Sequence, residues 1–320
     1  LRPEHFPAAF DLAMRTHLAE IDALANSSAA PTFNNTIEGL ERAGLRLSRT
    51  ASIFWNIASA DTNEKIQSLE RDLAPRMSAH FVQITQNQRL FERVARVWNN
   101  RHALQLDDEQ GRVLKRCYEG FVRSGACLEG TARRRFGDIK KRLAELGTNF
   151  GQNVLADEAS FMLELHDEKE LAGLPESLRQ AMASAANERE TQAPYVVTLS
   201  RSLIEPFLTY SDRRDLRKIA FEAWTMRGQN GNASDNRELI AETLLLRQEL
   251  AELLGFATYA DFKLDNTMAQ TPTKVRSLLE TVWPHAVAKA AEERDRLAQA
   301  ARSTGVNIDI EPWDWRYWAE

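Results

Sequence analysis

Six histidines are the residues of this chain best suited to bind a metal ion: His5, His17, His80, His102, His166 and His285. A hydrolytic metal site within one helix usually needs two neutral imidazoles four residues apart. The closest two histidines here are twelve residues apart. His17 and Glu20 do share one helical face, and we interpret them as a surface or capping pair. The sequence therefore predicts no local metal site, and nothing in it favours a site assembled from remote histidines.

Residues suited to nucleophilic or phosphate chemistry also lack the required context. The chain has no Gly-x-Ser-x-Gly motif, which would present a serine nucleophile on a sharp turn. Cys117 and Cys127 both fall in helical patterns, so we interpret them as small packing side chains of a reduced protein. The segment 227–232 has two glycines but no Lys-Ser/Thr ending, so it predicts a loop between helices. The acidic pairs Glu188/Glu190 and Glu292/Glu293 indicate solvated helix faces.

Three further groups have a functional interpretation and a structural one, and the structural one is favoured for each. A basic group within 133–142 lies opposite an apolar seam and is interleaved with Asp138 and Glu145, which is typical of a solvated helix face rather than a nucleic-acid stripe. The aromatic residues of 313–318 are interpreted as packing residues rather than a ligand-stacking platform. Glycosylation motifs at Asn26, Asn34 and Asn232 would matter only in a secreted eukaryotic protein.

The composition is typical of a folded protein with long helices. Of 320 residues, 43% are hydrophobic and 27% are charged, which excludes disorder as the main state. Glycine and proline number only 14 and 10, against a usual combined share of about 12%. The net charge of -5 disfavours a general nucleic-acid binder. No membrane span or signal peptide is expected, and the missing initiator methionine suggests a cut chain in a cytoplasmic protein.

Apolar residues that return every three or four positions predict a mainly α-helical fold. The clearest stripe runs through Phe136, Ile139, Leu146 and Phe150. Thr271 before Pro272 predicts a helix start, and Gly255 predicts a helix end. Asp61 with Glu64 resembles a capping box. The predicted helices are 4–27, 36–58, 62–100, 107–124, 130–157, 176–190, 212–228, 235–254 and 272–303.

The helical pattern changes once, between residues 158 and 200. Segments 160–165 and 195–199 are short, apolar or β-branched and bounded by turn-forming residues, so we predict two strands that flank a helix starting near Pro175. The sequence thus predicts an N-terminal helical subdomain at 1–157, a small α/β insertion at 158–200 and a second helical region at 201–320.

Eight segments in order resemble one family of zinc metallopeptidases, that of thimet oligopeptidase, oligopeptidase A and peptidyl-dipeptidases. The first, Phe-Asn-Asn-Thr-Ile-Glu-Gly-Leu-Glu-Arg-Ala-Gly at 33–44, is similar to the family's N-terminal helix opening, and the details are most similar to bacterial peptidyl-dipeptidases. Each segment is weak alone, but their shared order across the whole chain makes the match specific. The other seven are 90–94, 121–126, 150–155, 223–228, 246–260, 268–272 and 312–318.

This resemblance implies a mostly helical hydrolase built as two halves around a channel that admits short peptides. In that family two histidines of an HExxH helix and a later glutamate bind zinc, and the HExxH glutamate activates the metal-bound water. Those motifs lie downstream of the segment that 312–318 resembles, beyond Glu320. We therefore expect this chain to be the N-terminal part of such an enzyme, truncated before the HExxH segment, with no catalytic, cofactor-binding or metal-binding residue of its own.

The expected partners are short peptides for the parent enzyme and the C-terminal catalytic half of the same chain, with no nucleic acid and no membrane. The fragment would form one wall of the channel and be inactive alone, and zinc would belong to the parent enzyme. Residues 315–320 predict the start of a helix whose continuation is missing. The alternative from another class is a stand-alone helical domain that presents a groove to a protein partner.

Overall fold

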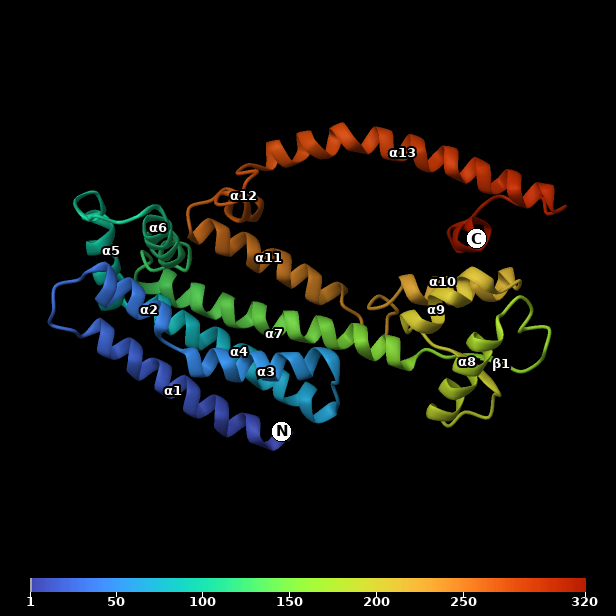
Figure 1. Cartoon of the computed structure of the whole chain (residues 1–320), viewed down its shortest axis with the longest axis horizontal. Helices are drawn as coiled ribbons and strands as arrows, with labels where there is room; N and C mark the ends of the chain where they lie inside the picture. Colours follow the sequence, from blue (N-terminus) through green and yellow to red (C-terminus); the bar gives the residue numbers. More distant parts are fainter. Residues whose placement is uncertain (1) are drawn as a thin grey trace. The chain divides into compact units, whose positions relative to one another are not determined.

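The computed structural model describes residues 2–320, and helices dominate it (Figure 1). Contacts between elements divide the chain into two compact units, one of residues up to 149 with 241–263, the other of 150–240 with 264–320. Two helices, α7 (Gly130–Ser160) and α11 (Arg237–Leu253), have residues in both units. The predicted mainly α-helical fold is confirmed.

The first unit consists of helices that pack side by side through apolar stripes. Besides parts of α7 and α11 it holds α1 (Phe6–Ala25), α2 (Gly39–Arg42), α3 (Leu45–Ala60), α4 (Glu64–Thr85), α5 (Gln88–Asn99), α6 (Asp108–Arg123) and most of α12 (Tyr259–Leu264). Helix α1 packs against both α3 and α4. One core gathers around Phe10, Phe54 and Leu73, and a second around Leu90 and Val94.

The second unit combines helices with a two-stranded sheet. It holds β1 (Leu163–Leu165), α8 (Glu176–Glu188), β2 (Tyr195–Val197), α9 (Arg201–Tyr210), α10 (Arg214–Thr225), α13 (Pro272–Ser303) and α14 (Trp315–Ala319). The strands are antiparallel, with Leu163 opposite Val197 and Leu165 opposite Tyr195. Leu165, Met182 and Phe207 lie in the core that the sheet shares with α8 and α9. The predicted strand pair is therefore confirmed, and the division at residues 157 and 200 stays a prediction.

Two long helices expected from the sequence are broken in the structure. The predicted helix 62–100 is wrong as one element, because α4 ends at Thr85 and Asn87 starts α5 by accepting a hydrogen bond from the Leu90 backbone N–H. The predicted helix 36–58 is interrupted at Gly44, whose φ of 76° lies in the left-handed region. This conformation favours glycine because it has no Cβ. Apolar residues keep their helical spacing across both breaks, so the sequence pattern does not indicate either of them.

The cap assignments have mixed outcomes. Thr271 starts α13 by accepting from the Lys274 N–H, and Gly255 follows α11 with a φ of 83°, as predicted. Asp61 was the wrong cap for α4. Asn63 takes that position, because its side-chain oxygen accepts from the N–H groups of both Lys65 and Ile66. No helix within residues 2–320 has the length and apolar character needed to cross a bilayer.

Gly173 provides a test of the second unit's packing. Its φ is 83°, and an added Cβ would lie 2.2 Å from the Tyr210 carbonyl oxygen. We therefore expect Gly173→Ala to lower the free energy of unfolding by about 2–3 kcal/mol. Gly151 within α7 is the control, because nothing lies within 4 Å of its added Cβ. Gly151→Ala should be neutral or stabilising by up to about 1 kcal/mol. Equal urea midpoints for the two variants would contradict this.

Candidate functional site

The structure brings together two of the six histidines, His17 from α1 and His80 from α4. Nε2 of His80 lies 3.0 Å from Nδ1 of His17, although 63 positions separate them in sequence. His17 is 8% exposed and His80 is 5% exposed, whereas His5, His102, His166 and His285 are exposed. The interpretation of His17 as a surface or capping residue was therefore wrong. It occupies the buried stripe of α1 because its neighbours at three and four positions along that face, Met14 and Ile21, are buried too.

Burial keeps this histidine pair neutral. Desolvation is the main cause that lowers the pKa of His80, to about 4, and the nearby His17 lowers it further. Burial also lowers the pKa of His17, against an opposing effect of Glu20. Two neutral imidazoles at this distance form one hydrogen bond, in which one ring donates and the other accepts. At neutral pH the pair is therefore a polar contact without charge.

The His17 ring is fixed by the backbone at the break between α2 and α3. A Cβ built on Gly44 would lie 2.7 Å from Cε1 of His17, so the imidazole packs directly on the glycine backbone. Glu20, one turn further along α1, accepts a 2.7 Å hydrogen bond from the Gly44 N–H. The helix break and the buried imidazole thus hold each other in place.

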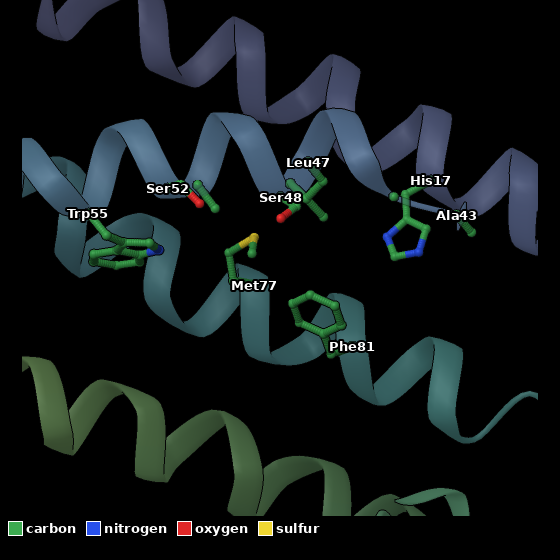
Figure 2. A pocket seen from close by; sticks show the side chains of 10 residues that line it. His17, Ala43, Leu47, Ser48, Ser52, Trp55, Met77 and Phe81 are labelled. Carbon is green, nitrogen blue, oxygen red and sulfur yellow. The ribbon is translucent and has the colours of Figure 1, made fainter. Parts of the chain in front are cut away.

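A pocket opens beside His17, between α3 and α4. Figure 2 shows His17 at one end of the pocket and Trp55 at the other, with side chains of α3 and α4 between them. The cavity volume is about 580 Å³, within the range of small-molecule sites. Its lining has no charged side chain and includes Leu47, Met77 and Phe81.

Metal ligation has no support among the described residues. Within residues 2–320, no three His, Cys, Asp or Glu side chains converge as potential ligands. The histidine pair contributes only two candidate ligands, and their mutual hydrogen bond occupies one nitrogen of each ring. The absence of family catalytic and metal residues from this chain stays a prediction.

Cys117 does not lie in the kind of environment that a nucleophilic thiol requires. Cys117 is half-buried against the core around Leu90 and Val94, and its burial raises the pKa of the thiol to about 11. The thiol is therefore protonated at neutral pH and a weak nucleophile. Cys127 is exposed, and both cysteines are free thiols.

The glycine-containing segment 227–232 is a loop between α10 and α11, as predicted, and a buried carboxylate organises it. Asp157 of α7 accepts hydrogen bonds from the Gly228 N–H at 2.7 Å, from Asn230 at 2.9 Å and from Asn232 at 2.8 Å. Burial alone would raise the pKa of Asp157, but these donors hold it below its ordinary value. The three donors satisfy the carboxylate oxygens, so Asp157 shapes the loop rather than offering a free base.

The C-terminal aromatic segment is anchored by a buried ion pair. Asp314 is fully buried and accepts from Arg217 at 2.9 Å and from Arg214 at 2.8 Å. Arg217 is 2% exposed and also donates to the Ser211 and Trp313 carbonyls. Its guanidinium carbon lies 4.1 Å from the centre of the Tyr317 ring. The predicted packing role of these aromatic residues therefore has a specific partner, the α9–α10 pair.

Comparisons with known proteins connect this chain to peptidases. The model of peptidase family M3 matches residues 207–320. Dipeptidyl carboxypeptidases of Salmonella typhimurium and Escherichia coli are each 32% identical over 99% of this chain, which covers 46% of either protein. Oligopeptidase A of Salmonella typhimurium is 29% identical over the whole chain and 48% of its own length. The chain thus spans about half the length of the curated relatives it matches.

The buried ion pair gives a testable effect on stability. Asp314→Asn keeps the shape of the side chain but leaves Arg217 buried without a counter-charge, which we expect to cost about 3 kcal/mol. Asp295→Asn is the control, because Asp295 and its partner Arg294 are both exposed and should change stability by less than about 0.5 kcal/mol. Urea unfolding followed by tryptophan fluorescence measures both. Equal losses in the two variants would show that the buried pair contributes no more than a surface pair.

The histidine pair predicts a specific pH dependence of stability. The His80 pKa of about 4 in the folded state lies below the ordinary value of 6.5, so the unfolded chain takes up a proton first as pH falls. Stability should therefore fall between pH 6.5 and 4, by up to about 1.4 kcal/mol per pH unit for this one group. His80→Gln keeps a hydrogen-bonding partner but cannot ionise, so its profile should be flatter. His102→Gln, at an exposed position, is the control. Parallel wild-type and H80Q profiles would refute the assignment.

Proposed function

Because this chain is a relative of the peptidases of family M3, as its eight segments led us to expect, we propose that it is the N-terminal part of a zinc-dependent cytoplasmic oligopeptidase or peptidyl-dipeptidase. The observation that carries the proposal is the match over 99% of the chain to peptidases about twice as long. In this proposal the remaining half supplies the HExxH helix and the zinc. The present chain forms one wall of a channel that limits substrates to short peptides.

The residues of this chain do not fit a catalytic zinc. The His17–His80 pair is fixed in a mutual hydrogen bond, and no third ligand converges on it within residues 2–320. A closed structural zinc site uses four protein ligands, and a catalytic one usually uses three. We therefore assign no catalytic step to this chain. Its proposed role is structural, namely to shape the channel and support the catalytic half.

An unpartnered apolar face on α13 supports the docking of a second polypeptide half. Leu278, Leu279, Val282 and Trp283 recur at helical spacing, and their exposed fractions run from 56% to 69%. Along this helix only Ala301 is buried. A contiguous apolar stripe of this kind is uncommon on a monomer and usually marks an interaction site. We propose that the catalytic half covers it.

The activity is tested on this chain and on the longer protein from which it derives. The longer protein should cleave short peptides, and a chelator should abolish the cleavage, because the proposed reaction depends on zinc. Residues 1–320 alone should show no cleavage. Chelator-insensitive cleavage, absence of cleavage by the longer protein, or cleavage by residues 1–320 alone would each contradict the proposal. If the longer protein shows no peptidase activity but binds another protein, the alternative of an interaction domain would be favoured.

The apolar face of α13 is tested by expressing residues 1–320 and the remaining half as separate chains. Leu279→Glu with Trp283→Glu should reduce their co-purification by about tenfold or more, because charges would be buried without partners. The matched control is Ser277→Glu with Thr281→Glu, which adds the same charge to exposed positions elsewhere around the same helix. Equal co-purification of the two double variants would place the interface elsewhere.

A further inference from the structure

The loop between α10 and α11 contains Asn230 followed by Gly231, the only Asn-Gly pair in the sequence. Asparagine is among the thermolabile residues. It is most reactive before glycine, because a residue without a Cβ lets its backbone nitrogen reach the asparagine side chain. We propose that Asn230 is a deamidation site that the contacts of Asp157 protect, and that its deamidation releases the loop from α7. This inference is independent of any peptidase activity.

The reaction needs only water and the two residues themselves. The backbone nitrogen of Gly231 attacks Cγ of Asn230, a nitrogen–carbon bond forms, and the bond from Cγ to Nδ2 breaks. Nδ2 leaves as ammonia, taking up the proton that the Gly231 nitrogen loses. Water then opens the resulting cyclic imide at one of its two carbonyls and leaves aspartate or isoaspartate at position 230.

The site is open to water, but hydrogen bonds hold both reacting residues. Asn230 and Gly231 are both exposed. Nδ2 of Asn230 donates to Oδ2 of Asp157 at 2.9 Å, and the Gly231 N–H donates to Oδ2 of Asp235 at 2.8 Å. The leaving group and the attacking nitrogen are therefore each bound to a different carboxylate. The attack requires the Gly231 nitrogen to turn toward Cγ of Asn230, and both hydrogen bonds resist that movement.

Asp157 is the residue of α7 to which the loop is bound. It is 4% exposed, and besides Asn230 it binds the Gly228 N–H at 2.7 Å and Asn232 at 2.8 Å. Because a buried carboxylate needs such donors, each of the three contacts keeps the loop against the helix. Reaction at Asn230 therefore requires local opening of the loop, and its rate follows the fraction of molecules in which the loop is open.

Deamidation prevents the loop from closing again. The reaction replaces the donor Nδ2 by a carboxylate oxygen, so Asp157 loses one of its donors and faces a second negative charge. Asp235 already places a like charge near Asp157, so the product adds a third carboxylate to one small region. Isoaspartate also lengthens the backbone by one methylene group. Opening of the loop and deamidation of Asn230 thus promote each other.

Asn232 is an internal control, because it also is exposed and donates to Asp157, but Ala233 follows it and its Cβ hinders the attack. Peptide mapping by mass spectrometry, after incubation of residues 1–320 at mildly alkaline pH, measures both asparagines. In urea above the unfolding midpoint Asn230 should deamidate faster than Asn232. Without urea Asn230 should react about tenfold or more slowly than in urea, because its charged hydrogen bond is intact. Equal rates at Asn230 with and without urea, or equal rates of the two asparagines in urea, would overturn the proposal.

Asp157→Asn tests the protection. It removes the charge and turns an amide N–H₂ toward the loop's donors, so deamidation of Asn230 without urea should accelerate by about tenfold or more. Asp138→Asn is the matched control, the same change at an exposed position of the same helix, and should leave the rate unchanged. An unchanged rate in Asp157→Asn would overturn the proposal. Should that variant prove unfolded by circular dichroism, Asn232→Ala decides, because it removes only one donor to Asp157 and should also accelerate the reaction.

Asn230→Asp tests the release of the loop, because it reproduces one product of the reaction. Hydrogen exchange of the backbone amides in 226–236 should become about tenfold or more faster than in the freshly prepared wild type, since a donor to a buried carboxylate is replaced by a like charge. Gln229→Glu is the control, because it adds the same charge to the neighbouring exposed position, whose side chain donates to Met226. Equal exchange in the wild type and Asn230→Asp, or equal acceleration in both variants, would overturn the proposed release.

Discussion

A buried charged side chain needs hydrogen-bond partners, and in this chain the partners of three such side chains lie in loops and at a helix end. Arg93 donates to the Ser27 and Ala29 carbonyls and to Thr36, which fixes the loop between α1 and α2. Asp157 accepts a hydrogen bond from the loop between α10 and α11. Asp314, at the start of the last helix, forms an ion pair with Arg217 of α10. Removing one partner of such a contact costs far more than a surface ion pair contributes. The helices supply the apolar cores, but these contacts decide how the chain connects them.

Three of the eight segments that resemble the peptidase family contain residues of these contacts. Segment 90–94 contains Arg93, segment 223–228 ends at the glycine that donates to Asp157, and segment 312–318 contains Asp314. The resemblance in these places includes residues whose contacts shape the fold. The buried carboxylates of Asp157 and Asp314 and the buried guanidinium of Arg217 are engaged in these contacts.

Helical periodicity was sufficient to predict the fold class, and two short β-branched segments bounded by turn-forming residues predicted the strands, because these patterns are local. The breaks at Gly44 and Gln86 escaped prediction, since the apolar stripe continues through each of them. The His17–His80 contact spans 63 positions, and a contact so remote leaves no spacing signal. A signal for burial did exist, because each histidine occupies the apolar stripe of its own helix. Weighing the face on which a histidine lies, and not only its distance to the next histidine, would have identified both as buried.

Helix α13 raises the question of how a helix with so little burial is stable, because most helical stability in proteins comes from packing. The sequence of α13 explains part of this stability. Thr271 caps the first turn, alanine recurs through 286–301, and Glu292 pairs with both Lys289 and Arg296 on adjacent turns. Each of these favours a helix in isolation. Pro284 acts against it by removing one backbone hydrogen bond. Intrinsic propensity can therefore form the helix without a partner. In the proposed docking the apolar face would be ordered beforehand, so less conformational entropy would be lost.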